Sequence, residues 1–241
     1  MEKNTFLEHL QELRSRLLKS LLVMMACFLG LVYFSNDIYL IISEPLLNFL
    51  PSGSSMIATE VASPFLAPLK LTFFASLLLS MPFLLNQIWG FMAPGMYVNE
   101  KKLSFLVLLS SLFLFYLGIL FTYFLVLPLV FNFFTGSAPE GILIMTDISR
   151  YLDFVLSMMF AFSFAFEIPV FIFLLIWSGT TDSDTLRSKR PYVVIGCFAV
   201  GMLLTPPDVI SQTLLAIPAW LLFELGIVMA DLVVKKEKKD L

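Results

Sequence analysis

The sequence predicts an all-α polytopic membrane protein with six transmembrane helices. Hydrophobic residues make up 59% of the 241-residue chain and charged residues only 14%, and the mean hydropathy is +0.92. A soluble domain has about one quarter charged residues. Apolar runs of about 20 residues, the length that a helix needs to cross a hydrocarbon core of roughly 30 Å, follow one another with short polar joints. We therefore expect one membrane domain over residues 1–241.

Six runs qualify as spans, each bounded by charges, proline or glycine. They cover about residues 17–34, 66–91, 103–124, 151–177, 192–205 and 209–234. The fifth is the shortest, because 14 residues rise only about 21 Å as a helix. Such a span requires a thinned bilayer or shielding by its neighbours.

The first outer loop, residues 35–64, is too long for a simple turn. It contains NDIYLIISEPLLNFL, in which the apolar residues are near helical spacing and no residue is basic. This pattern predicts a short amphipathic helix on the outer membrane surface. Four prolines lie within or at the ends of the helical runs and are expected to bend them, namely Pro82, Pro128, Pro169 and Pro218.

The basic residues indicate the orientation. Of the 15 Lys and Arg residues, 13 lie before or at the start of the first span, after the sixth, or in the joints that follow the second and fourth. Only Lys70 and Arg150 fall on the other side, so the positive-inside rule places both termini in the cytoplasm. The first residues are unlike a cleavable signal, and the lack of a transit peptide favours a bacterial or archaeal plasma membrane.

One carboxylate, Glu167, lies inside an apolar run, in FAFEIPVFIFLLIW (Phe164–Trp177). A charge at the centre of a span costs about 2.5 to 3.5 kcal/mol on insertion scales. We expect Glu167 to face a polar groove or to be protonated, and by default to have a function. The alternative is a neutral carboxyl group bonded to a backbone carbonyl that Pro169 leaves free.

Other polar residues have two interpretations when judged from the residues alone. Glu8, Glu12 and Arg16 are spaced four apart, as in a solvated ladder worth tenths of a kcal/mol. Glu100 fits a first-turn acid after an Asn99 cap. Three residues of the last two spans would bond either within the chain or to another helix. These are Met202, Thr205 and Gln212.

Several kinds of enzyme are excluded. No Gly precedes a Lys, so no Walker A loop is present. The sole histidine, His9, lies outside the spans, and no second buried Asp completes an aspartyl dyad. Cys27 and Cys197 lie in apolar runs without a CxxC motif, which suggests neither a disulfide nor a metal site. We expect no enzymatic activity, no cofactor, no metal and no nucleic-acid partner.

Four stretches carry a resemblance over nearly the whole chain: HLQELRSRL, FMAPGMYVNEKK, SFAFEIPV and KRPYVVIGCFAVGMLLTPPDVISQTLLAIPAWLLFELG. They resemble the TatC family, the C subunits of the twin-arginine protein translocase. The resemblance implies a cupped-hand shape with short fifth and sixth spans. It also implies a multimeric receptor that binds twin-arginine signal peptides of folded proteins and recruits the single-span subunits TatB and TatA. Export would use the proton-motive force.

The resemblance assigns roles to residues. The signal-peptide site falls on Glu12 and Glu100, with Phe91 beside them and Arg14 in the same motif. Two carboxylates can each accept a forked guanidinium, whereas Lys offers only a point charge. Lys101 and Lys102 stand where some relatives have Arg.

The same resemblance places the buried Glu167 on the concave face, where it would draw in water and thin the bilayer. The surface that receives a partner helix falls on Met202, Thr205 and Gln212.

Two alternative functions remain at this point. A proton-coupled small-solute transporter could use Glu167 as its relay, although two pseudo-symmetric halves would then be expected and the spans are unequal. A scaffold could assemble partner helices without binding any signal peptide.

Overall fold

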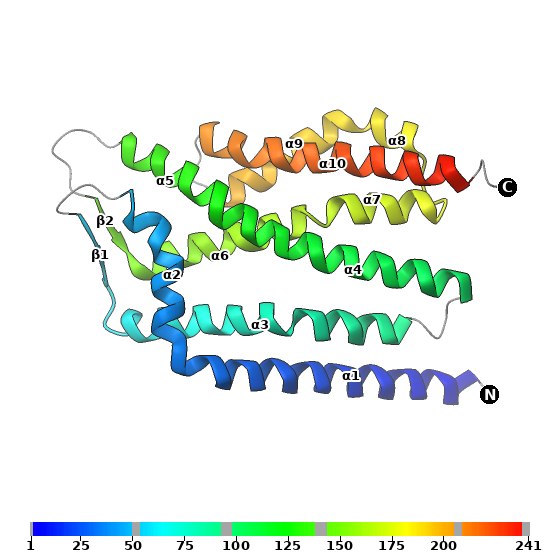
Figure 1. Cartoon of the computed structure of the whole chain (residues 1–241), viewed down its shortest axis with the longest axis horizontal. Coiled ribbons are helices and arrows are strands. Elements are labelled where there is room, and N and C mark those ends of the chain that lie inside the picture. The colour runs from blue at the N-terminus through cyan, green and yellow to red at the C-terminus, as the bar shows by residue number, and fades with distance from the viewer. Residues whose placement is uncertain (1, 50–53, 93–97, 138–143, 205–208, 238–241) are drawn as a thin grey trace. The chain divides into compact units, whose positions relative to one another are not determined.

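The structure is a computed structural model that describes residues 2–49, 54–92, 98–137, 144–204 and 209–237. Within these ranges the regular elements are helices apart from two short strands (Figure 1), so the predicted all-α class is confirmed. The chain forms two compact units, residues 1–43 with 58–112 and residues 44–57 with 113–241. The organisation as one membrane domain over residues 1–241 stays a prediction.

The elements follow one another along the chain with these bounds: α1 (Glu2–Leu31), the 3-10 helix η1 (Val32–Phe34), α2 (Ser35–Leu47), β1 (Ser55–Ile57), α3 (Ser63–Met92), α4 (Val98–Phe121), the π-helical turn η3 (Thr122–Val126), α5 (Leu127–Gly136), β2 (Met145–Asp147), α6 (Ile148–Ala165), α7 (Ile168–Trp177), α8 (Ser183–Ser188), α9 (Arg190–Leu204) and α10 (Val209–Glu237).

Five helical stretches among the described residues are long and apolar enough to cross a membrane, and a sixth is shorter. The five are Leu10–Leu47, Ser63–Phe91, Ser104–Gly136, Ile148–Trp177 and Gln212–Leu232, and the shorter one is Arg190–Leu203. Six spans with a short fifth are consistent with this set. The expected shortness does not extend to the sixth span, because α10 has 29 residues.

Two predicted spans differ from simple helices, and proline explains both differences. The third continues past residue 124 through η3 into α5, where Pro128 occupies the first turn. The fourth is divided into α6 and α7 at Phe166 and Glu167, and Pro169 lies in the first turn of α7. Proline has no N–H to continue a helical ladder, but it is well suited to begin a new one.

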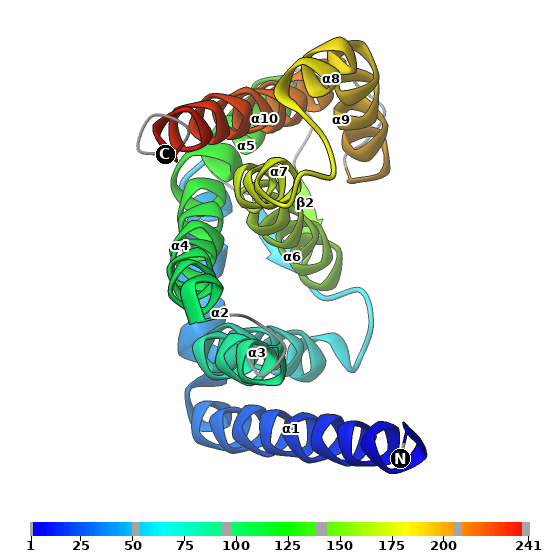
Figure 2. The same ribbon diagram turned by 90° about the vertical axis from the view of Figure 1, so that its right-hand side faces the viewer.

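The first unit contains the antiparallel pair α1 and α3, which lie side by side in both views (Figures 1 and 2). Phe28 and Phe73 meet edge to face, with ring centroids 6.1 Å apart. The buried Ser20 donates to the Arg16 carbonyl at 2.9 Å, and the buried Thr72 donates to the Pro68 carbonyl at 2.8 Å. Hydroxyl groups within these helices are thus satisfied by their own backbone, as lipid requires.

The helix predicted after the first span is confirmed as α2, which turns away from α1 at η1 (Figure 1), while its location on the outer membrane surface stays a prediction. In the second unit, β1 pairs in parallel with β2, and Ser55 lies opposite Met145. Asp147 ends β2 and caps α6, because its carboxylate accepts the Ser149 and Arg150 N–H groups at 2.9 and 3.0 Å. The strand pair therefore sets where α6 begins.

The core of the second unit is centred on α6. Fully buried apolar side chains on α6 include Leu152, Val155, Met158 and Phe162. Exposed apolar side chains cover the outside of the helices, with Phe113 at 67% and Phe171 at 62%. A large apolar surface of this kind fits a lipid solvent rather than water.

Two glycines hold neighbouring helices close to the α6–α7 break. A Cβ on Gly118 of α4 would lie 2.8 Å from the Phe162 carbonyl oxygen, and a Cβ on Gly226 of α10 would lie 2.8 Å from the Pro169 Cα. Both neighbours are backbone atoms, which cannot rotate away. Lipid supplies no hydrophobic force between helices, so their association depends on close van der Waals contact at small residues.

We predict that Gly118→Ala and Gly226→Ala each lower stability in detergent by about 1 to 3 kcal/mol, because the added methyl group overpacks a backbone contact. The measurement is the thermal unfolding midpoint of the purified protein. Gly196→Ala is the matched control, since a Cβ there meets nothing within 4 Å. Equal midpoints for all three variants would show that the two contacts are not tight.

Candidate functional site

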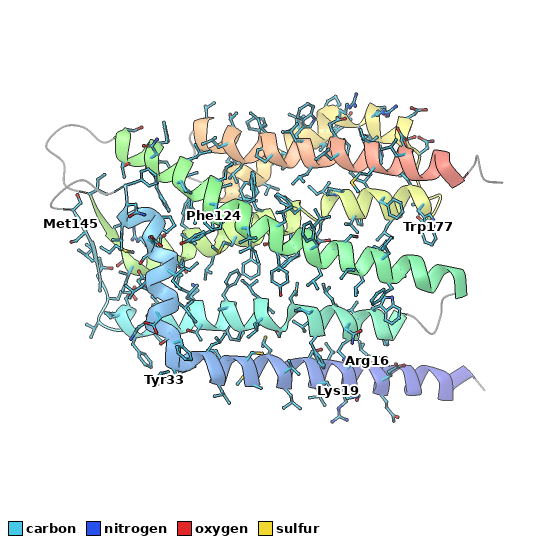
Figure 3. All side chains as sticks on the ribbon, in the orientation of Figure 1. Arg16, Lys19, Tyr33, Phe124, Met145 and Trp177 are labelled. Atoms are coloured by element: carbon cyan, nitrogen blue, oxygen red, sulfur yellow. The ribbon has the colours of Figure 1, made fainter. Side chains whose placement is uncertain are left out.

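Arg16 connects α1 to the end of α3. Its Nε and Nη2 donate to Glu12 Oε1 at 2.9 and 2.7 Å. Nη2 also donates to the Gly90 carbonyl at 2.9 Å, and Nη1 donates to the Gln87 Oε1 at 3.3 Å, with a longer 3.5 Å contact to the Gln87 carbonyl. Figure 3 shows Arg16 on the α3 side of α1 and Lys19 on the opposite side. The predicted Glu12–Arg16 pairing is therefore one part of a larger contact.

The last turn of α3 suits a guanidinium for two reasons. Carbonyls at a helix C-terminus have no intrahelical partner, and they carry the negative end of the helix dipole. In addition, Gly90 leaves room, because a Cβ there would lie 2.5 Å from Arg16 Nη1. A charged donor with several N–H groups satisfies these carbonyls while remaining paired with the Glu12 carboxylate.

The structure describes the side chains of three other residues of this region, besides Gln87 and Gly90. The Glu12 side chain is 36% exposed and the Arg16 side chain 25%. Phe91 follows Gly90 directly and is half-buried, whereas Arg14 on α1 is exposed. The region thus combines a reachable carboxylate, helix-terminal carbonyls and an aromatic side chain.

Glu100 belongs to α4, in the same unit, but its side chain lies outside the described residues. The helix of Glu100, α4, is positioned by a contact between Trp89 on α3 and Phe105 on α4, whose rings meet edge to face with centroids 5.8 Å apart. This contact packs the beginning of α4 against the end of α3. The structure therefore places Glu12, through Arg16, beside the last turn of α3, to which Phe91 belongs, while the position of the Glu100 carboxylate stays a prediction.

Sequence reasoning missed Gln87 and Gly90. Spacing along one helix related Glu12 to Arg16, but Gln87 and Gly90 lie 71 and 74 residues beyond Arg16. QIWGF contains nothing that distinguishes it from other span ends. Only the packing of α3 against α1 reveals that its last carbonyls accept from a guanidinium.

Glu167 lies at the break between α6 and α7, where it is half-buried. Its N–H donates to the Phe164 carbonyl at 3.0 Å, and its carbonyl accepts from the Phe171 N–H at 2.9 Å. Glu167 lies between the C-terminus of α6, where the helix dipole disfavours negative charge, and the N-terminus of α7, where it favours negative charge, and its side chain makes no capping hydrogen bond to α7.

An apolar groove of about 500 Å³ begins beside this break. Ala165 and Ile168, on either side of Phe166 and Glu167, line it together with residues of α9 and α10. Small side chains are frequent in its wall, including Ala161, Ala165, Gly196, Gly201 and Ala219. Such residues let another apolar chain or helix approach closely.

The predicted partner-docking residues lie where α9 and α10 meet. Met202 on α9 is 60% exposed, and Gln212 on α10 is half-buried. A Cβ on Gly201 would lie 3.5 Å from the Gln212 carbonyl oxygen, so the two helices are in contact there. Thr205 falls outside the described residues.

A separate group of charged side chains joins α8 and α9 to α10. Arg187 Nη2 donates to Asp231 Oδ2 at 2.6 Å, and the Ser183 hydroxyl group also bonds Asp231. Arg190 makes a forked pair with Glu224, at 2.7 and 2.6 Å. The Thr185 N–H donates to Asp182, which caps α8, and this bond lowers the pKa of the Asp182 carboxyl group. These acidic and basic groups are paired with one another, and they stabilise the packing of α8 and α9 on α10.

Comparison with known proteins gives consistent matches. A family model described as "Sec-independent protein translocase protein (TatC)" matches residues 8–218. A protein of that name from Azotobacter chroococcum mcd 1 is 58% identical over 219 residues, covering 91% of this chain and 86% of that protein. Its namesake from Escherichia coli (strain K12) is 54% identical over 228 residues, covering 95% of this chain and 88% of that protein.

A solved structure agrees with these matches. The "Crystal Structure of Twin Arginine Translocase Receptor- TatC" aligns with a TM-score of 0.80 at 32% identity. The alignment covers 94% of this chain and 99% of that one. Both the sequence and the fold therefore resemble the same group of proteins over nearly their full lengths.

Proposed function

Because this chain belongs to the TatC family of Sec-independent protein translocase proteins, we propose that it is the receptor and core subunit of a twin-arginine translocase. This multi-pass bacterial membrane protein binds twin-arginine signal peptides at the cytoplasmic face. It then recruits the single-span subunits TatB and TatA, and the complex exports folded proteins using the proton-motive force. Both termini lie in the cytoplasm, as the distribution of basic residues favours.

The observation that carries this proposal is the contact of Arg16 with Glu12 and the last turn of α3. The site already accommodates one guanidinium through a carboxylate and backbone carbonyls. Glu12 stays partly exposed, so an arginine from outside can approach the same carboxylate. A site of this chemistry suits arginine, because a planar fork matches carboxylate geometry and an ammonium group does not.

The signal peptide carries two arginines, and the proposal assigns a carboxylate to each. Glu12 on α1 accepts one and Glu100 on α4 accepts the other, while Phe91 contacts the peptide between them. Packing of Trp89 against Phe105 supports this arrangement, because it holds the beginning of α4 at the end of α3. Arg14 belongs to the same surface and is exposed.

Partner helices dock at the ends of α9 and α10, on Met202, Thr205 and Gln212. Glu167 provides a polar position within the membrane, at a helix break beside an apolar groove. The short α9 supports local thinning of the bilayer, because its 15 residues rise only about 22 Å. A polar break and a short span together weaken the barrier that a passenger crosses.

Replacement of either carboxylate by its amide tests the receptor. We predict that Glu12→Gln and Glu100→Gln each weaken binding of a labelled Arg-Arg signal peptide by roughly 10- to 100-fold, since each removes a charge-assisted hydrogen-bonded pair. The measurement is the Kd with purified protein in mild detergent, next to a Lys-Lys peptide of otherwise identical sequence.

Glu44→Gln is the matched control, because Glu44 is an exposed acid on α2. It should leave both affinities unchanged. If the parent protein bound the two peptides equally, or if neither substitution changed the Kd, the scaffold alternative would replace the receptor.

The proposed role of Glu167 is tested by export and by crosslinking to the partner helices. We predict that Glu167→Ala lowers both export of a folded reporter in cells and disulfide crosslinking to partner helices. Loss of an interhelical hydrogen bond of about 1 to 2 kcal/mol weakens association roughly 5- to 30-fold. Asp153→Asn changes an exposed acid on α6 and serves as the control. Unchanged export and crosslinking for Glu167→Ala would remove Glu167 from the mechanism.

Gln212→Leu tests the docking surface. We predict weaker crosslinking between α10 and a partner helix, because leucine keeps the size but loses the amide group that bonds across helices. Thr213→Val is the matched control, since the Thr213 hydroxyl group bonds its own helix at the Val209 carbonyl. Crosslinking of Gln212→Leu at the parent level would argue that this surface docks no helix.

A further inference from the structure

We propose that Arg16 is a positioning residue that gives the site its preference for arginine over lysine. It does so by holding the Glu12 carboxylate in one orientation against the last turn of α3. The proposal rests on the proposed function, because it concerns how the receptor distinguishes an Arg-Arg peptide from a Lys-Lys peptide.

Arg16 takes its own orientation from α3. Nη2 donates to the Gly90 carbonyl and Nη1 to the Gln87 side-chain amide, so both ends of the guanidinium are attached to the same helix turn. A planar group held at two points cannot rotate. Its remaining N–H groups therefore point in a direction that the backbone of α3 determines.

Glu12 in turn takes its orientation from Arg16. Nε and Nη2 both donate to the same oxygen, Oε1, at 2.9 and 2.7 Å. These two bonds limit the rotamers that a partly exposed glutamate on a helix surface can adopt. With Oε1 occupied by Arg16, the two N–H groups of an incoming guanidinium are left to converge on Oε2, and this needs that oxygen to be fixed beforehand, whereas a lysine ammonium group tolerates many orientations. Fixing the position of Oε2 thus favours arginine selectively.

A different role for Arg16 would be that of an occupant, which an incoming arginine displaces from Glu12. The contacts favour positioning. Displacement would leave the Gly90 and Gln87 acceptors without the donor that they have now, at the negative end of a helix. An arginine that joins Glu12 while Arg16 stays in place keeps these bonds.

Gly90→Ala provides a selective test. A Cβ at this position would lie 2.5 Å from Arg16 Nη1, at the far end of a flexible side chain, so the guanidinium moves and the helix does not. The substitution leaves both Glu12 and Arg16 in the chain. Arg16→Lys is the second variant, because it keeps the charge and removes the fork. Gly30→Ala is the matched control, since a Cβ at this other glycine of the α1–α3 pair meets nothing within 4 Å.

The experiment measures the Kd of the full-length protein in detergent for the Arg-Arg and Lys-Lys peptides, and the ratio of the two. We expect Gly90→Ala and Arg16→Lys to lower this preference by about tenfold. The Lys-Lys affinity should stay near that of the parent, and Gly30→Ala should change nothing. A purely structural role for Arg16 would weaken the binding of both peptides equally.

The contrary outcomes are distinct. If the parent prefers Arg-Arg and both variants keep that preference, or lose affinity for both peptides equally, Arg16 does not set selectivity. If the variants bind Arg-Arg more tightly than the parent, Arg16 is a displaced occupant and the proposal is wrong. If the parent itself shows no preference, the receptor function fails, and the role of Arg16 fails with it.

Discussion

The need to satisfy every backbone polar group without water governs this structure. In a bilayer an unpaired N–H or C=O costs several kcal/mol, so the chain crosses as helices, in which the backbone groups pair within each segment. Two buried hydroxyl groups within helices follow the same requirement, as Thr122 bonds the Gly118 carbonyl and Ser163 bonds the Met159 carbonyl. The interruptions at Pro128 and Pro169 occur where proline has no donor to offer and a new helix begins.

This requirement also connects structure to recognition. The last carbonyls of α3 need donors, and Arg16 provides them from the neighbouring helix. Because Arg16 is held at the end of α3 by these bonds, it can also orient the Glu12 carboxylate. Charged side chains are costly near lipid. The single guanidinium of Arg16 donates to a carboxylate, a side-chain amide and a carbonyl, so three acceptors are satisfied by one charged group.

Close packing is the second constraint, because lipid tails are as apolar as the helices that they surround. Gly118 and Gly226 let α4 and α10 approach the backbone on either side of the α6–α7 break. The carboxylate of Glu167 is thus placed by a segment that is held from two directions. Ile172, Phe223 and Ile227 complete this contact with a buried cluster between α7 and α10.

Periodicity, hydropathy and charge along the chain determined the helical class, the spans, the α2 helix and the unusual position of Glu167. These are local properties, since a helix and its insertion into lipid depend on residues within about 20 positions of one another. The family motifs added the candidate residues Glu12, Glu100 and Phe91 without their surroundings. Tertiary structure decided that Arg16 bonds Gly90, 74 residues away, and that Gly118 and Gly226 face backbone rather than lipid. Contacts between distant helices depend on how whole helix faces pack, and no local pattern specifies which faces meet.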